Sequence, residues 1–555
     1  MAAGNFDQTR RTALALGGAA LLAPRVGLAQ EPGLLVTGGP IYTGLGDGGK
    51  VEAVAILGDR IVFAGALAAA KAAAPDAKQI DLGGAAAFPG FVDSHAHLTE
   101  IGLREMTLNL EGSASIAELQ SRLKAWAAQQ PAGPIRGRGW IETHWPDKRF
   151  PTRADLDAVV PDRPVLLSRA DGHAVVVNSK TLELSGVTAS TPNPAGGEIL
   201  RDKTGAPSGM FVDNAMDLVE GRFPKPDLAA KREALGRADR LYRSRGWTGV
   251  HSMSVDQEDL DILRVMARQG ALNLRVDNYM DPASAKEVLA TGPSVDPTGR
   301  VRLRGIKLYA DGALGSRGAA LLAPYSDKPE STGLVVTPHD VMVDLMRKAK
   351  AANAQVAVHA IGDRGNRNTL DAMAEVLGTA RTDRRWRIEH AQILSLADLP
   401  RFAAMGVIAS MQPSHAIGDL YFAPARLGPD RLKGAYAWRS LLESGAVVCA
   451  GSDAPVEKGD PLIEFYAATW RHALNGFAGP DWGLDEAVSR VQALHMLTGA
   501  AAYAIGREAE LGTLEAGKRA DLTVFSKDLM TVEPSEIIKA QATLTVIGGK
   551  VAYGA

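Results

Sequence analysis

The sequence predicts an α/β protein built around a (β/α)8 TIM-like barrel, with a β-sandwich domain formed by both chain ends. Three observations support this fold class. Eight short apolar segments recur through the middle of the chain, and helix-like stretches separate most of them. The two chain ends instead contain short alternating segments with glycine turns. A long stretch after the first apolar segment interrupts the alternation and predicts an insertion.

The barrel strands are the short apolar segments, taken in chain order. They are expected at residues 87–92, 249–252, 274–279, 305–310, 356–360, 386–389, 407–411 and 447–450. Helical patterns between them include 340–352, 365–377 and 396–405. The barrel domain is expected to span 89–505. Because its first two strands lie far apart, residues 104–240 are predicted as an insertion with a helix at 116–130 and Pro/Gly-rich loops.

The two ends of the chain are predicted to fold together as the β-sandwich. Strand patterns occur at 34–36, 54–57, 60–64 and 79–82, and again at 521–525 and 542–547. Gly548 and Gly549 suit a turn after the last of these. Since the termini of a domain often lie close together, residues 30–88 and 506–555 are expected to form one domain.

The first 29 residues resemble an export signal. Thr9-Arg10-Arg11-Thr12 precedes an apolar run at 13–23, and Gly27-Leu28-Ala29 offers small residues for cleavage. The run is too short to span a bilayer as an ordinary helix, so no stable membrane insertion is expected. The pattern predicts a twin-arginine signal, use of the twin-arginine export machinery, and a mature protein in the periplasm or otherwise outside the inner membrane.

The composition excludes several classes of protein. With 46% apolar and 22% charged residues, the chain is neither disordered, collagen-like nor a coiled coil. A net charge of −2 without a basic block gives no electrostatic basis for binding nucleic acid. The single cysteine, Cys449, excludes an intrachain disulfide and cysteine-rich zinc sites. Association is open, although a homodimer is the commonest form when a soluble protein associates.

Potential metal ligands lie at or near the ends of five predicted strands. Because the carboxyl ends of barrel strands open onto one face, these side chains are expected to converge. Alternate strand residues point to the same side, so both imidazoles of His95-X-His97 can face the barrel mouth. Histidines with a carboxylate suit zinc or a similar divalent metal. The candidates are His95, His97, Lys307, His359, His390 and Asp453.

Lys307 is unusual in such a set, because an ammonium group repels a metal cation. Two interpretations are open from the residues alone. The lysine forms an ordinary salt bridge, or its amine has reacted with carbon dioxide to give a carbamate that bridges two metals as an anionic oxygen ligand.

Several segments, in this order along the chain, resemble the amidohydrolase superfamily, and the more local ones resemble its YtcJ-like branch, amidohydrolase family 3. The resemblance covers nearly the whole mature chain. It is carried by Pro89-Gly-Phe-Val-Asp-Ser-His-Ala-His97, Ala170-Asp-Gly-His173, Pro194-Ala-Gly-Gly-Glu198, Gly305-Ile-Lys-Leu-Tyr-Ala-Asp-Gly-Ala-Leu-Gly-Ser-Arg317, Val358-His-Ala-Ile-Gly-Asp363, Arg387-Ile-Glu-His390, Gly451-Ser-Asp-Ala-Pro455 and the return segment at 511–522.

This resemblance implies a binuclear centre of two divalent ions, expected to be zinc. His95, His97 and Asp453 would hold one ion, His359 and His390 the other, and a carboxylated Lys307 would bridge them. A bound metal makes hydroxide available near neutral pH and polarises the substrate carbonyl. Asp453 is expected to take the proton of the attacking water and pass it to the leaving nitrogen.

The resemblance therefore predicts a hydrolase of carbon–nitrogen bonds other than peptide bonds, acting on small amides or N-acyl compounds. A deaminase with one metal, and a cyclic-amide, ester or lactone hydrolase of the same superfamily, are the alternatives. A barrel that binds a small ligand without turnover is the alternative from another class. Candidate contacts to substrate are Trp140, His173, Asp311, Arg317, Gln412 and His415.

Overall fold

The computed structural model describes residues 33–46, 48–142, 145–170, 172, 174–194, 197–479 and 482–554. The predicted export signal and His173 lie outside these residues. In the part of the chain that the structure describes, no helix is long and apolar enough to cross a membrane.

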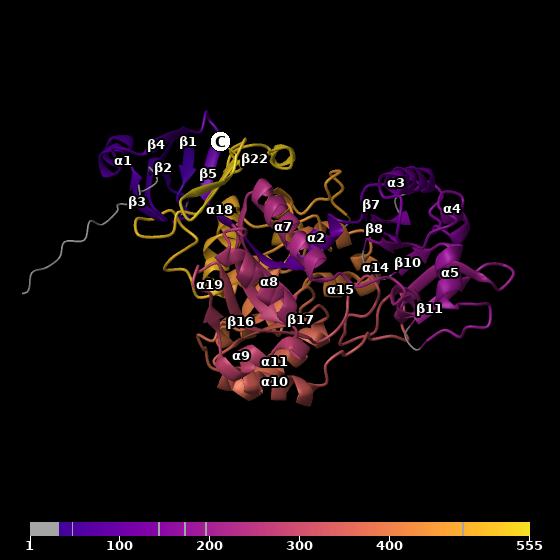
Figure 1. Cartoon of the computed structure of the whole chain (residues 1–555). Helices are drawn as coiled ribbons and strands as arrows, with labels where there is room; N and C mark the ends of the chain where they lie inside the picture. The colour runs from indigo at the N-terminus through magenta and orange to yellow at the C-terminus, as the bar shows by residue number, and fades with distance from the viewer. Residues whose placement is uncertain are drawn as a thin grey trace, which may run out of the picture.

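The centre of the molecule is the predicted barrel, a nearly closed sheet of eight parallel strands (Figure 1). Its neighbours pair in the order β20-β19-β18-β17-β16-β14-β13-β6. The strands are β6 (Phe91–Ala96), β13 (Trp247–Val255), β14 (Arg275–Met280), β16 (Val301–Tyr309), β17 (Gln355–Ala360), β18 (Arg387–His390), β19 (Ile408–Met411) and β20 (Val448–Ala450). A short strand, β15 (Ser294–Val295), pairs antiparallel with β16.

Helices follow the barrel strands, and α7 shows how capping residues set the ends of a helix. Asp227 accepts a hydrogen bond from the amide of Ala230 at the start of α7, and Gly246 ends that helix in the left-handed conformation. The helices are α2 (Leu98–Arg104), α7 (Leu228–Arg245), α8 (Gln257–Arg268), α9 (Lys286–Thr291), α10 (His339–Ala351), α11 (Asp363–Leu377), α12 (Leu399–Met405), α13 (Pro413–Asp419), α14 (Ala423–Leu427), α15 (Pro429–Leu432), α16 (Trp438–Glu443), α17 (Pro461–Trp470), α18 (Arg490–Leu497) and α19 (Gly499–Ala504).

The barrel closes where the chain after β20 meets β6. The amide of Asp453 donates to the carbonyl of His95 (2.6 Å), and the amide of His97 donates to Ala454 (2.8 Å). The carboxylate of Asp93 accepts from the amide of Ser452 at 2.9 Å. At Gly451 an added Cβ would lie 2.4 Å from the amide nitrogen of His95, so this close approach requires glycine. The closure places the Asp453 segment against the His95 strand.

The two chain ends form one continuous eight-stranded sheet. Its strands are β1 (Leu34–Tyr42), β2 (Lys50–Leu57), β3 (Arg60–Gly65), β4 (Lys78–Asp81), β5 (Ala86–Pro89), β21 (Leu522–Phe525), β22 (Ala542–Ile547) and β23 (Lys550–Tyr553), with α1 (Leu67–Ala73) against it and α20 (Pro534–Ile537) between β21 and β22. The antiparallel pair of β5 and β21 joins the two ends.

The first predicted barrel strand, 87–92, needs correction at Gly90. Residues before the glycine pair with β21 in the terminal sheet, and residues after it form β6 of the barrel. The amide of Gly90 donates to the carbonyl of Asp521, and an added Cβ would lie 2.4 Å from Thr248 Oγ1. One apolar run therefore serves two sheets, and β6 continues through His95 itself.

The segment between β6 and β13 contains a six-stranded sheet, to the right in Figure 1, where the sequence predicted only a helix and loops. The predicted helix is α3 (Ile116–Gln129), and the interval assigned to the insertion, 104–240, ends inside α7, which packs on α2. The other elements are β7 (Leu108–Asn109), β8 (Ile135–Trp140), β9 (Val165–Arg169), β10 (Ala174–Val177), β11 (Gly197–Arg201), β12 (Pro207–Asp213), α4 (Arg153–Asp157), α5 (Ser179–Ser185) and α6 (Asp217–Glu220). We call residues 108–220 the inserted domain.

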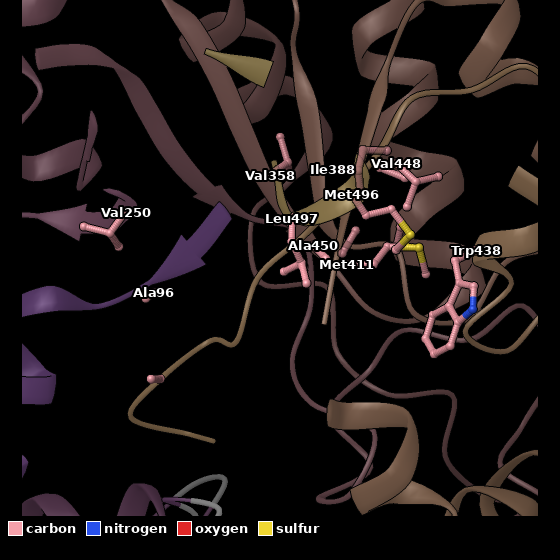
Figure 2. Close-up of a cluster of buried hydrophobic side chains, with 14 of the residues drawn as sticks. Ala96, Val250, Val358, Ile388, Met411, Trp438, Val448, Ala450, Met496 and Leu497 are labelled. Carbon is pink, nitrogen blue, oxygen red and sulfur yellow. The ribbon is translucent and has the colours of Figure 1, made fainter. Parts of the chain in front are cut away.

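Apolar side chains of barrel strands and covering helices fix the wall of the barrel (Figure 2). Fully burying one such side chain contributes about 1.5–3 kcal/mol. The cluster that carries the last strands, and with them the carboxyl-end loops, includes Val358, Ile388, Met411, Val448, Trp438, Met496 and Leu497.

Candidate metal centre

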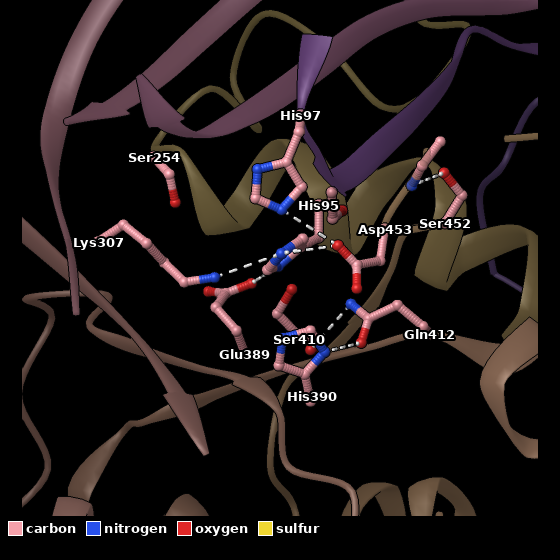
Figure 3. A network of polar contacts seen from close by, with 12 residues as sticks. His95, His97, Ser254, Lys307, Glu389, His390, Ser410, Gln412, Ser452 and Asp453 are labelled. Atoms are coloured by element: carbon pink, nitrogen blue, oxygen red, sulfur yellow. Dashed lines mark hydrogen bonds and ion pairs between the residues drawn. The ribbon is translucent and has the colours of Figure 1, made fainter. Parts of the chain in front are cut away.

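The predicted ligands come together at the carboxyl ends of the barrel strands (Figure 3). His95 lies on β6, Lys307 on β16, His359 on β17 and His390 at the end of β18. Asp453 follows β20, and His97 is the residue immediately before α2. His95, Lys307, His390 and Asp453 are each at most 6% exposed.

The side chains are close enough to share bound ions. Asp453 Oδ1 lies 3.4 Å from His95 Nε2 and 3.3 Å from His97 Nε2. The ring centroid of His390 lies 4.8 Å from that of His95 and 4.5 Å from that of His359. Ligand atoms of His95, His390 and Asp453 all lie within 4.8 Å of one another, which makes these three a candidate metal site.

The protonation of the histidines suits metal binding. Burial lowers the pKa of His95 to about 4 and that of His359 to about 3, with Lys307 as a further cause in both cases. Both imidazoles are therefore neutral near pH 7, which is the form that donates a lone pair to a metal. The donor set of neutral imidazoles and a carboxylate fits zinc or a similar divalent ion.

A buried ion pair beneath the centre orients His95. The Nδ1–H of His95 donates to Glu389 Oε2 at 2.6 Å, which directs the Nε2 lone pair toward Asp453 and Lys307. Arg387 Nη2 donates to the same carboxylate oxygen at 2.9 Å. Burial raises the pKa of Glu389, but the Arg387 guanidinium and the hydrogen bond from His95 together outweigh it and hold that pKa well below its usual range. The carboxylate is thus an anion that fixes the tautomer of His95.

Glu389 and Arg387 were not predicted as site residues from the sequence, although both lie in the segment Arg387–His390 that ends at a candidate ligand. The missed signal is the alternation along β18. Arg387 and Glu389 are two residues apart on a strand, so they point to the same side, here toward the barrel interior.

His390 is held by its amide partner and by an unusual backbone. Its Nδ1–H donates to Gln412 Oε1 at 2.7 Å, so this predicted contact residue orients a ligand. The φ angles of His390 and Asp453 are +72° and +57°, in the left-handed region. Such a conformation costs on the order of 1–3 kcal/mol for a residue other than glycine, and it persists only where the surrounding structure enforces it.

Asp311 anchors backbone beside His359, where the sequence reasoning expected a contact to substrate. Its carboxylate accepts from the amides of Ala320 (2.8 Å), Ile361 (2.9 Å) and Gly362 (2.8 Å). Asp311 Oδ1 also lies 3.6 Å from His359 Nε2. With its oxygens used in this way, Asp311 holds two loops together next to a ligand.

The remaining predicted contact residues divide into two groups. His415 reaches the centre, with Nε2 3.6 Å from Asp453 Oδ2 and its ring stacked on that of His390. Trp140 instead lies in the core of the inserted domain, and its indole donates to the carbonyl of Leu167. Arg317 pairs with Asp327 at 2.9 Å in its loop. Trp140 is thus packed in a core and Arg317 is ion-paired, and contact of either residue with substrate stays a prediction.

A barrel that gathers these histidines, a lysine and an aspartate at its carboxyl-end face defines a metal-dependent hydrolase. The comparisons with known proteins give the family. The family model described as "Amidohydrolase family" matches residues 78–553, and the chain belongs to this family.

Two curated relatives and one solved structure share most of the chain. YtcJ of Bacillus subtilis (strain 168), whose name assigns it as an amidohydrolase, is 33% identical over 93% of this chain and 98% of its own length. The N-substituted formamide deformylase of Arthrobacter pascens is 29% identical over 90% of this chain and 95% of its own. A metal-dependent hydrolase of Pyrococcus horikoshii has a TM-score of 0.75 at 29% identity, covering 90% of this chain and 99% of that structure.

Proposed function

We propose that this protein hydrolyses carbon–nitrogen bonds, other than peptide bonds, in small amide or N-acyl substrates. The observation that carries the proposal is the convergence of His95, His390 and Asp453 on one centre, with His97 and Lys307 around them and His359 against His390. The name of the Arthrobacter relative, an N-substituted formamide deformylase, supports the choice of bond.

The candidate ligands divide into one group for each of two metal ions. His95, His97 and Asp453 would hold one divalent ion, because one carboxylate oxygen faces both Nε2 atoms. His359 and His390 would hold the second, since their rings adjoin each other. When bound, such ions supply Lewis acidity and lower the pKa of a coordinated water.

Lys307 would bridge the two ions as a carbamate. Lys307 is 1% exposed, and no carboxylate of the described residues lies within 4.0 Å of Nζ. Nζ lies 3.4 Å from His95 Nε2 and 5.1 Å from the centre of the Tyr309 ring. Burying a charge without a counter-ion is costly, so an unmodified cation is a poor fit to this position. A carbamate would give this position an anionic oxygen ligand.

Asp453 is the group assigned to proton transfer. Oδ1 faces His95 and His97, while Oδ2 lies 3.6 Å from His415 Nε2 on the other side of the carboxylate. The carboxylate would accept a proton from the attacking water and release it to the leaving nitrogen. His415 would hold the orientation of that carboxylate.

Asp453→Asn tests the role of Asp453, with Asp327→Asn as a control carboxylate in the loop that contains Arg317. On N-substituted formamides, the wild-type protein should release formate and an amine. D453N should lose at least about a hundredfold in turnover, the lower range for general acid–base catalysis. D327N should keep most of it. Retained activity in D453N contradicts the proton-transfer role.

Product analysis separates the proposed reaction from the alternatives. A one-metal deaminase releases ammonia, and an ester hydrolase releases an alcohol from an ester while leaving amides intact. We include in the proposal that the metal is zinc and that residues 1–29 direct twin-arginine export to the periplasm or otherwise outside the inner membrane. A homodimer is the form of association to test first. Metal analysis, export with Arg10 and Arg11 replaced by lysine, and sedimentation test these points.

A further inference from the structure

The loop that follows β20 is held by side chains from several parts of the fold. Residues 453–460 begin with Asp453 and lead into α17. Four carbonyl groups of this 453–460 loop accept hydrogen bonds from arginine or tryptophan side chains. The bonds are Arg138 Nη1 to Pro455 (2.5 Å), Arg104 Nη1 to Glu457 (2.9 Å), Arg104 Nη2 to Lys458 (3.2 Å) and Trp247 Nε1 to Gly459 (2.9 Å). Arg245, at the end of α7 against the barrel, also donates to the carbonyls of Lys458 and Gly459.

Arg138 differs from the other donors in its origin. Arg104 and Trp247 belong to α2 and β13 of the barrel, whereas Arg138 lies on β8 of the inserted domain. Its second nitrogen, Nη2, donates to the carbonyl of Ala170 (3.0 Å), just after β9 of the same domain. One guanidinium therefore connects the inserted domain to the loop that carries Asp453.

The backbone of Asp453 depends on such external support. Its positive φ angle is sparsely populated by residues other than glycine and requires enforcement by neighbours. On its N-terminal side, the amide of Asp453 donates to the carbonyl of His95 at 2.6 Å. On its C-terminal side, the amide of His97 donates to the carbonyl of Ala454 at 2.8 Å, and Arg138 donates to the carbonyl of Pro455, one residue further on. The segment that carries the aspartate is thus held by the chain of β6 on one side and by the inserted domain on the other.

We infer that Arg138 is a positioning residue through which the inserted domain keeps the Asp453 carboxylate in place for metal binding. Removing the guanidinium leaves the Pro455 carbonyl without this donor and frees the segment to relax toward a less strained backbone. The Asp453 oxygen would then move away from His95 Nε2 and His97 Nε2. The inference rests on the proposed role of Asp453 as a metal ligand.

The test uses Co2+ as the probe and the full chain, stripped of metal. Arg138→Met removes the donor but keeps an apolar stem. Arg136→Met is the matched control, because Arg136 is on the same face of β8, two residues earlier. Arg136 instead packs over the ring of Phe223 (4.9 Å), just after the end of the inserted domain, and among the described residues it forms no hydrogen bond with the 453–460 loop.

We expect R138M to lower Co2+ affinity at least about tenfold, the lower range for a residue that orients a ligand. Its Co2+ absorption spectrum should shift toward that of D453N, and amide exchange of residues 453–460 should accelerate in the metal-free protein. R136M should change none of these. Arg138→Lys keeps a cationic donor and should restore part of the affinity, and it replaces R138M if that variant does not fold.

A double-mutant cycle decides whether Arg138 acts through Asp453. In the D453N background, R138M should cause no further loss of Co2+ affinity. Wild-type affinity in R138M, or the same loss in both backgrounds, would overturn the inference. Failure of the proposed function would look different: the wild-type protein would not cleave amides, while the Co2+ cycle would keep its outcome.

Discussion

Glu389→Gln is a sensitive probe of the metal centre, because Glu389 links a buried arginine to a ligand. The carboxylate pairs with Arg387 and accepts from His95 Nδ1, and all three side chains are fully buried. Breaking a buried ion pair by neutralising one partner costs about 3–5 kcal/mol, because the other charge stays buried. E389Q should therefore destabilise the metal-free protein by about that amount.

The same substitution should weaken metal binding. An amide in place of the carboxylate is a poorer acceptor for the Nδ1–H of His95, so both the tautomer and the ring orientation are less well fixed. Loss of such a partner typically lowers metal affinity by about 10–100-fold. The two effects have different origins, and a second variant separates them.

Replacing both partners, as in Arg387→Met with Glu389→Leu, removes both buried charges. Such replacements are often neutral in stability for an isolated pair. Arg387 also donates to the carbonyl of Ser94 and to His251, so the double variant should recover only part of the stability lost in E389Q. Its metal affinity should remain low, because His95 still lacks an acceptor for Nδ1–H. The second substitution should thus raise stability without raising metal affinity.

Urea unfolding of the metal-free proteins and metal titration against a chelator measure the two quantities. Asp521→Asn is a suitable control, since Asp521 forms a buried pair with Arg275 (2.6 Å) between the terminal sheet and the barrel. D521N should lose stability and keep wild-type metal affinity. The reasoning is refuted if E389Q is as stable as the wild type, or if the double variant regains full metal affinity.

Three further changes have defined outcomes. Metal-free protein should lose stability as the pH falls from 6.5 through about 4, because His95 and His359 take up protons in the unfolded chain but stay neutral when folded. The loss is on the order of 1.4 kcal/mol per pH unit for each histidine. Urea unfolding at several pH values should show a smaller slope in H359Q than in the wild type. Lys307→Ala should lower the metal content measured by elemental analysis, and a short added carboxylate should restore part of that content. An unchanged metal content in this variant would contradict a bridging role for Lys307. Gly102→Ala should destabilise the protein by about 1–3 kcal/mol in thermal unfolding without lowering metal affinity, since an added Cβ would lie 1.8 Å from the carbonyl oxygen of Ala234.

The barrel was predictable because its local signals agree with its tertiary structure. Each strand is a short buried apolar run, and parallel strands need crossovers that carry helices. The convergence of the candidate ligands was predictable as well, since residues at the carboxyl ends of barrel strands share one face. The division at Gly90 was not predictable, because one glycine separates two apolar strands, and their partners β21 and β13 lie more than 150 residues further along the chain.

The surroundings of the other candidate residues could not be predicted from the sequence, because they depend on the direction in which each side chain points. Trp140 and Arg317 lie in segments with the expected pattern, but contacts with residues distant in sequence turn them toward a core and a loop aspartate. The strands of the inserted domain were missed although Val165–Arg169 and Ala174–Val177 are rich in β-forming residues. The role of Arg138 depends on how two domains pack, which no local pattern encodes.

Whether the barrel holds a two-metal centre is decided by the metal content of the purified mature protein after loosely bound ions are removed. We expect about two equivalents of a divalent metal per chain, as in two-metal hydrolytic sites. One equivalent would contradict the bridged centre and favour the one-metal deaminase. A protein that holds no metal and cannot be reconstituted with any would contradict the assignment as a metal-dependent hydrolase.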